Sequence, residues 1–314
     1  MSMAHAEAVA SDTRRQIDGH TIVREVTVTP AMCGHNALLV GQIGDWTWDT
    51  VSRLCGINAF RAADGEGHPT YLSHYFYQVL GGRELHLRSL TFGDRIQVLS
   101  TCYGFGSESV LTIHRLASVA HDLPAELSIG ELLHARRPKC LYVQNVNRWI
   151  QRGESGNQQL HTASPLGFQK AHLPTLSAEE SPRLVYDLAR RQGAFVAPPG
   201  SRSAGEWTVR YTVDAARDLN GVGLLCFASY FAIVDGALAH VWRELGRTER
   251  SFMDRLVVDT RLCFLGNAEA GTRLAIRVRR AMHGHAERFD MQLVEEASQR
   301  MLAVAALDLE EGTT

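Results

Sequence analysis

The sequence predicts an α+β fold in which two similar halves each wrap an antiparallel sheet around one central helix. In the second half, apolar residues alternate with a period of two, which predicts half-buried strands in WTVRYTV, RLAIRVR, RFDMQLV and MLAVAALDLE. Between the first of these strands and the others lies the long apolar segment GVGLLCFASYFAIVDGALAHVWREL, which predicts one buried helix after a turn at 218–221.

The first half repeats this order. VREVTVTP predicts a strand, and the glycine-led segment GHNALLVGQIGDWTWDTVSRLCG has the length and apolar content of a helix. Further strands are predicted in PTYLSHYFYQVL, RIQVLSTCYGFG and SVLTIHRL, with GFGSES as a hairpin turn. A strand, a buried helix and several antiparallel strands together describe a hot-dog unit, so the pattern predicts a tandem (double) hot-dog fold.

A few matched positions support a duplication. Phe92-Gly93-Asp94 precedes one strand as Ala270-Gly271-Thr272 precedes another, and the two helical segments share leucine and aspartate positions at a constant offset. The matched residues there are Leu38, Leu39 and Asp49 against Leu224, Leu225 and Asp235. The alternative is a single irregular α+β domain.

The expected organisation has four parts. Residues 1–20 are expected to be a flexible N-terminus, 21–135 the first hot-dog half, and 206–314 the second half. Residues 136–205 are punctuated by proline and glycine and show weak strand alternation, so we expect an extended connection with a short helix in SPRLVYDLARRQG.

Composition excludes several classes of function. A formal net charge of −2 gives no basic surface for nucleic acid. No apolar run reaches the roughly 18 residues of a membrane span, and no signal peptide is visible. Six scattered cysteines without a CxxC pair indicate reduced thiols in the cytoplasm. His283 and His285 lack a third ligand with suitable spacing, so we expect an enzyme without metal or cofactor.

One strand is unusually rich in aromatic residues. In PTYLSHYFYQ, strict alternation places Tyr71, Ser73, Tyr75 and Tyr77 on one face and His74 on the other. Such a strand is typical of packing or of a subunit interface, so a homodimer stays open.

The start of the first helix is the expected substrate site. If this helix begins near Gly41 and Gln42, its unpaired N–H groups could stabilise negative charge on a thioester oxygen. Alternatively, the glycines only permit helix-to-sheet packing. The second-half counterpart, near Phe227 and Ala228, is bulkier and is expected to be structural.

A polar cluster, QNVNRW, follows in the middle of the chain. Asn145, Asn147, Arg148 and the nearby Arg152 could bind the phosphates or pantetheine amides of coenzyme A. The alternative is that they are polar residues of the connection.

These segments also resemble a known family. GHNALLVGQIGDWTWDTV, NAFR, PTYLS, LTFGDR, GFGSESVLTIHRL, QNVNRW and TASPLGF are similar to the bifunctional acyltransferase/decarboxylases of leinamycin-type polyketide pathways, over most of the chain. The resemblance implies a double hot-dog fold. It also implies that methylmalonyl-CoA is decarboxylated and that its propionyl group passes to the phosphopantetheine thiol of an acyl carrier protein.

The resemblance further implies an essential tyrosine that accepts the acyl group. Tyr71 matches it, with Tyr75 and Tyr77 as competing choices, and His35, Asn36 and Thr70 are expected to bind substrate nearby. A tyrosine with an ordinary pKa near 10 is a weak nucleophile without a base. The alternative role is to orient the carboxylate while helix N–H groups hold the enolate oxygen.

Two rival functions stay open. A hot-dog dehydratase or thioesterase would use His35 or Asp45 as its base, and a non-catalytic acyl-binding scaffold would use neither. For the acyltransferase/decarboxylase, we expect an acidic carrier protein to dock on basic residues. The candidates are Arg136, Arg137, Lys139, Arg148 and Arg152.

Overall fold

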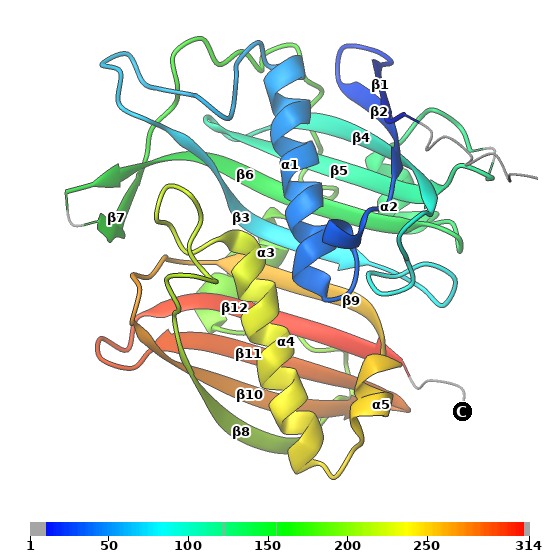
Figure 1. Cartoon of the computed structure of the whole chain (residues 1–314), viewed down its shortest axis with the longest axis vertical. Coiled ribbons are helices and arrows are strands. Elements are labelled where there is room, and N and C mark those ends of the chain that lie inside the picture. The colour runs from blue at the N-terminus through cyan, green and yellow to red at the C-terminus, as the bar shows by residue number, and fades with distance from the viewer. Residues whose placement is uncertain (1–10, 122, 155, 311–314) are drawn as a thin grey trace, which may run out of the picture.

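A single antiparallel sheet carries two long helices on one face (Figure 1). The computed structural model describes residues 11–121, 123–154 and 156–310. The main sheet has the strand order β1-β2-β4-β5-β6-β3-β9-β12-β11-β10-β8, and β7 pairs with β6. The strands are β1 (Thr13–Gln16), β2 (Thr21–Thr27), β3 (Tyr71–Leu80), β4 (Arg95–Phe105), β5 (Ser109–Ser118), β6 (Leu141–Gly153), β7 (Gly156–Thr162), β8 (Arg202–Thr212), β9 (Leu256–Phe264), β10 (Arg273–His283), β11 (Ala286–Glu295) and β12 (Met301–Glu310). The helices are η1 (Pro30–Met32), α1 (Asn36–Leu54), α2 (Ile129–His134), α3 (Arg183–Gln192), α4 (Phe227–Glu244) and α5 (Glu249–Met253).

The strand order is symmetric about the central pair, β3 and β9. From that pair outward, β6, β5, β4 and β2 on one side correspond to β12, β11, β10 and β8 on the other. Each half also contributes one helix, α1 or α4, to the same face of the sheet (Figure 1). The predicted double hot-dog fold is therefore confirmed.

The matched glycine turns are equivalent in space. Gly93 and Gly271 both have positive φ, 92° and 78°, a conformation that glycine adopts without a Cβ clash. Each donates its backbone N–H over 2.8 Å to a valine carbonyl, Val28 just after β2 or Val213 just after β8. These two turns support the duplication.

The matched leucines and aspartates are not equivalent. Leu38 and Leu39 lie inside α1, whereas Leu224 and Leu225 precede α4. The helix starts instead align Asn36 with Phe227. The expected register between the helices was therefore wrong.

The helices cross near their starts. A Cβ on Gly41 would lie 3.7 Å from the Cβ of Ala228, and a Cβ on Gly44 would clash with the Phe227 ring. The glycines of the first helix therefore permit close packing of helix on helix, rather than of helix on sheet.

The segment assigned to the connection contains a central strand. β6 lies between β5 and β3 and so belongs to the first half, which extends beyond residue 135. Its alternation is hidden because Gln144, Asn145 and Asn147 are buried amides, each hydrogen-bonded to a side chain of the sheet or of α1. The predicted short helix is confirmed as α3. Of the expected flexible N-terminus, residues 1–10 lie outside the described residues, and Thr13–Gln16 pair with β2 as β1.

The alternation of β3 is broken by a bulge. The register with β6 shifts between His74 and Phe76. As a result, His74 and Tyr77 both contact Phe227 of α4, while Tyr75 contacts Tyr186 of α3. The strict alternation expected for this strand was wrong beyond His74, because the bulge adds one residue to one edge of the ladder.

Within the described residues, no helix is both long and apolar enough to cross a bilayer.

Candidate active site

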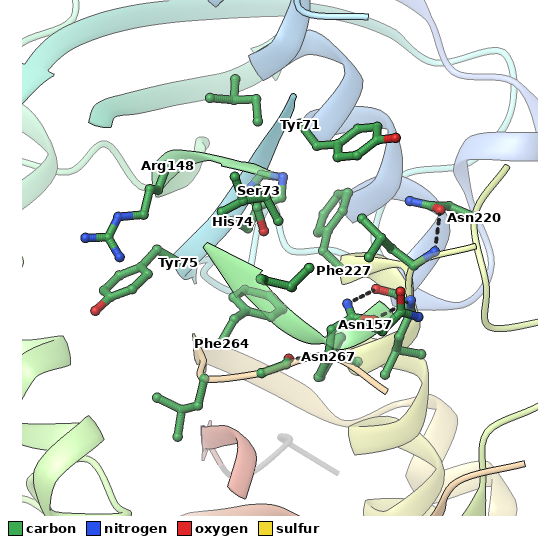
Figure 2. Close-up of a pocket in the computed structure, with 18 of the residues that line it drawn as sticks. Tyr71, Ser73, His74, Tyr75, Arg148, Asn157, Asn220, Phe227, Phe264 and Asn267 are labelled. Carbon is green, nitrogen blue, oxygen red and sulfur yellow. Dashed lines mark hydrogen bonds between the residues drawn. The ribbon is translucent and has the colours of Figure 1, made fainter. Parts of the chain in front are cut away.

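A cavity of about 410 Å³ opens where β3 and β9 separate, beside the start of α4 (Figure 2). The ladder between these strands begins at the pair Phe76 and Cys263 and ends at Leu80 and Asp259. Residues 71–75 therefore have a strand edge that β9 does not cover. The cavity is lined there by all five of these residues, by Phe227 at the start of α4, and by residues 264–267 at and after the end of β9.

Tyr71, the first residue of β3, lines this cavity. Figure 2 shows its side chain on the same side of β3 as Asn220, with Arg148 and Tyr75 on the opposite side. Across the described chain, no hydrogen bond or ion pair engages its hydroxyl group. The hydroxyl is therefore available to a bound molecule, and no base of the described residues hydrogen-bonds to it.

His74 lies deeper in the same cavity. Its ring packs against that of Phe227 in a tilted arrangement with centroids 4.0 Å apart, and its Nδ1 lies 3.0 Å from the amide Nδ2 of Asn147. Burial lowers the pKa of His74 to about 3, so the ring is neutral at physiological pH. Its Nε2 is buried and has no hydrogen-bond partner.

Asparagines hold the loops around the start of α4. Asn157 donates from Nδ2 to the carbonyls of Gly223 and Ala268, at 2.7 and 2.9 Å, and its Oδ1 is buried without a partner. Asn267 accepts the N–H of Leu225, at 2.9 Å. These bonds fix the wall of the cavity opposite β3.

The charged groups that line the cavity are arginines. Arg148 and Arg190 flank the ring of Tyr75, with guanidinium carbons 5.4 and 4.3 Å from its centroid. Arg300 is engaged by Glu295 and by the Asn267 carbonyl. Among the lining residues that the structure describes, none is Asp or Glu. The cavity is therefore suited to an anionic ligand.

The expected oxyanion site at the first helix is not formed. Because α1 begins at Asn36, the N–H groups of Gly41 and Gln42 lie in its second turn, where they bond to carbonyls four residues earlier. Neither residue lines the cavity. The cavity lies instead at the start of α4, the position expected to be filled.

His35 and Asn36 lie at the other end of the helix crossing. His35 is the exposed N-cap of α1, and the Asn36 side chain hydrogen-bonds to the Asp235 carboxylate, eight residues into α4. That places them about 12 Å along α4 from Phe227. Neither lines the cavity.

Of the remaining expected site residues, only Arg148 lines the cavity directly. Thr70 is buried next to Tyr71 in the sequence but does not line the cavity. Asn145 donates to Thr47 Oγ1 over 3.1 Å inside the first half, so it is a core amide. Asn147 does not line the cavity and contacts His74, which does. Arg152 donates to the carbonyl of Val222.

The basic group expected to dock a carrier protein is split. Arg136, Arg137 and Lys139 precede β6, whose Tyr142 pairs with Leu80, whereas Tyr71 pairs with Ile150. These three residues therefore lie at the opposite end of β3, about 30 Å from Tyr71. Arg148 is the member of the group at the cavity.

Sequence reasoning missed His74, Asn157, Arg190 and Asn220. Alternation placed His74 on the face of the strand opposite Tyr71, and its partner Asn147 is on the neighbouring strand. The signal that could have found His74 was the presence of His, Gln and Asn inside two largely apolar strands, HYFYQ and QNVNRW. The other three residues come from β7, α3 and the loop before α4, which local pattern cannot bring together.

In the described part of the chain, no group of three or more His, Cys, Asp or Glu side chains has a geometry that could hold a metal ion.

Known structures share the whole fold. An acyl-ACP thioesterase from Bacteroides thetaiotaomicron is 7% identical, with a TM-score of 0.56 over 92% of this chain and 98% of its own. The 12:0-ACP thioesterase from Umbellularia californica is 9% identical, with a TM-score of 0.55 over 92% and 94%. At such identities the similarity establishes the double hot-dog fold alone.

Sequence comparison gives the family. No similar sequence was found among curated proteins. Residues 23–197, more than half of the chain, match the LnmK N-terminal hot dog fold domain. This stretch includes α1, β3 and β6, and so Tyr71, His74 and Arg148. The chain therefore belongs to the LnmK N-terminal hot dog fold family.

Proposed function

We propose that this protein decarboxylates methylmalonyl-CoA and transfers the resulting propionyl group to the phosphopantetheine thiol of an acyl carrier protein. The observation that carries the proposal is the composition of the cavity. It combines the free hydroxyl of Tyr71, a neutral histidine and three arginines, and no carboxylate of the described chain lines it. Family membership supports the same assignment.

A malonyl group suits this cavity. Its carboxylate would meet no like charge, and the apolar side chains of Leu72, Leu225 and Phe264 line the space around it. A poorly solvated carboxylate next to a thioester favours loss of carbon dioxide, because the charge moves onto an oxygen that donors stabilise.

Hydrolysis fits less well. A thioesterase or dehydratase needs a base to activate water or to move a proton. His35 and Asp45, the candidates for that base, are both exposed and do not line the cavity. Tyr71 likewise has no base hydrogen-bonded to it among the described residues, which favours its role as a hydrogen-bond donor that orients the substrate over its role as an acyl carrier.

Arg148 and Arg190 fit the phosphate of the phosphopantetheine arm, which coenzyme A and carrier proteins share. Arg148 is exposed, Arg190 is partly exposed, and neither forms an ion pair in the described chain. Guanidinium groups bind phosphate through paired N–H donors. An acyl group attached to that arm would then extend past Tyr75 toward Tyr71.

The test is incubation of the protein with methylmalonyl-CoA and a carrier protein bearing its phosphopantetheine arm. Mass spectrometry of the carrier and measurement of released carbon dioxide are the readouts. Propionyl-carrier together with carbon dioxide supports the proposal. Free acid would indicate a thioesterase, and no turnover would indicate a scaffold.

A further inference from the structure

His74 lines the cavity and has a ring nitrogen with no hydrogen-bond partner in the described chain. The side chain is 5% exposed, and its Nε2 is buried without a hydrogen-bond partner. Leaving a buried polar atom without a partner costs about 1–3 kcal/mol, so such atoms call for an explanation. Because His74 lines the cavity, a ligand atom is the partner that its position can accept (Figure 2).

Asn147 determines which ring nitrogen carries the hydrogen. Its Nδ2 can only donate, so Nδ1 of His74, 3.0 Å away, accepts. In a neutral imidazole the hydrogen is then on Nε2. Nε2–H is therefore an uncharged, buried donor on a side chain that lines the cavity.

We propose that His74 is a catalytic residue whose Nε2–H donates a hydrogen bond to the thioester oxygen, and that Asn147 is its positioning residue. The inference rests on the proposed decarboxylation. In that step the bond from Cα to the carboxylate breaks, and its electron pair forms the C=C bond of an enolate. Carbon dioxide leaves, the thioester oxygen takes the negative charge, and Cα later takes a proton from water. Nε2 keeps its hydrogen throughout.

The surroundings hold the ring neutral and in place. Phe227, Tyr77 and Phe264 pack around it with centroid distances of 4.0, 5.3 and 6.3 Å. The titratable or charged groups near His74 or along the same cavity are Tyr71 and Tyr77 of β3, His114 of β5, Arg148 of β6, Arg190 of α3, Tyr230 of α4, and Arg300 before β12. None of these is an acid that would stabilise a charged imidazole.

The first test removes or preserves the donor. His74→Phe keeps a ring but loses Nε2–H, and we expect kcat for carbon dioxide release to fall about a hundredfold. KM should change less than about threefold, since the hydrogen bond strengthens mainly in the transition state. His74→Gln can place an amide donor near the Nε2 position and should recover at least about tenfold of the loss. His161→Phe, at an exposed histidine outside the cavity, is the matched control.

The second test inverts the ring. In Asn147→Asp, the new carboxylate accepts from Nδ1, so neutral His74 carries its hydrogen there and Nε2 becomes an acceptor. The carboxylate also raises the pKa of His74 from about 3. Protonation then returns a hydrogen to Nε2, so kcat of this variant should rise as pH falls through the raised pKa. Asn147→Ala should lack this rise, which a merely structural role for Asn147 would not produce.

The outcomes separate this inference from the proposed function. If the parent releases carbon dioxide and folded His74→Phe stays within about threefold of it, His74 is not catalytic. If the parent instead hydrolyses the thioester, the proposed function is wrong, and the same variants still test His74, because hydrolysis also develops charge on that oxygen. If the parent neither decarboxylates nor hydrolyses the thioester, the proposed function and the catalytic role of His74 are both wrong. Thermal unfolding of each variant excludes loss of folded protein as the cause.

Discussion

The starts of α4 and α1 occupy equivalent positions in the two halves, yet one borders a cavity and the other is filled. At the start of α4, Phe227 packs over Gly44, and the cavity opens beside it. At the start of α1, Asn36 meets Asp235, whose carboxylate is 2.8 Å from the guanidinium of Arg255.

Single residues account for the difference. The ninth residue of α1 is Gly44 and that of α4 is Asp235. The residue before β3 is Thr70, and the residue before β9 is Arg255, which is 5% exposed and also donates to the Phe252 carbonyl. A buried ion pair therefore occupies the second position. The duplication has kept the fold in both halves while only one helix start has space for a ligand.

Removing one partner of the ion pair at the start of α1 should have the largest effect on stability. Arg255→Leu leaves the largely buried carboxylate of Asp235 without its arginine partner, which should lower the free energy of unfolding by about 3–5 kcal/mol. Chemical denaturation measures this effect. Asp235→Leu combined with Arg255→Leu is the control and should be close to the parent in stability. Equal destabilisation of the single and double variants would show that the ion pair is not what fills this site.

At the open position, Tyr71→Phe should reduce turnover by at least about a hundredfold, because it removes the hydroxyl that faces the substrate. The melting temperature should be unchanged, since that hydroxyl makes no hydrogen bond within the described chain. Steady-state release of carbon dioxide is the measurement. Activity within about threefold of the parent would exclude both the orienting and the acyl-carrying role.

A substitution at the crossing of α1 and α4 should have the next largest effect. Gly44→Ala places a Cβ inside the Phe227 ring and should cost about 1–3 kcal/mol by overpacking, with a loss of kcat as the start of α4 shifts. Gly41→Ala is the matched control, because its Cβ would meet Ala228 at an ordinary 3.7 Å. Similar unfolding curves for the two variants would mean that Phe227 moves freely and does not shape the cavity.

Features set by local sequence could be predicted, whereas contacts between residues far apart in the sequence could not. Alternation and helix length located α1, α4 and most strands, because those signals are local. The open site was placed at the wrong helix, because Phe227 looks too large to admit a ligand. Its ring in fact packs against a glycine on the other helix. No local pattern contains that contact, and β6 was missed for a related reason: its interior amides are satisfied by other elements.

The smallest expected effect concerns the arginines near the two helix starts. Arg255 is buried and neutralised by Asp235, whereas Arg148 and Arg190 line the open cavity without an ion pair in the described chain. If these two bind the phosphate of the phosphopantetheine arm, Arg148→Ala with Arg190→Ala should raise KM for methylmalonyl-CoA about tenfold at low salt, with little change in kcat. The difference should shrink as salt screens the charges. A methylmalonyl thioester of N-acetylcysteamine lacks that phosphate, so the variant and the parent should process it equally. An equal loss on both substrates would show that the arginines support Tyr75 and the cavity wall rather than a phosphate.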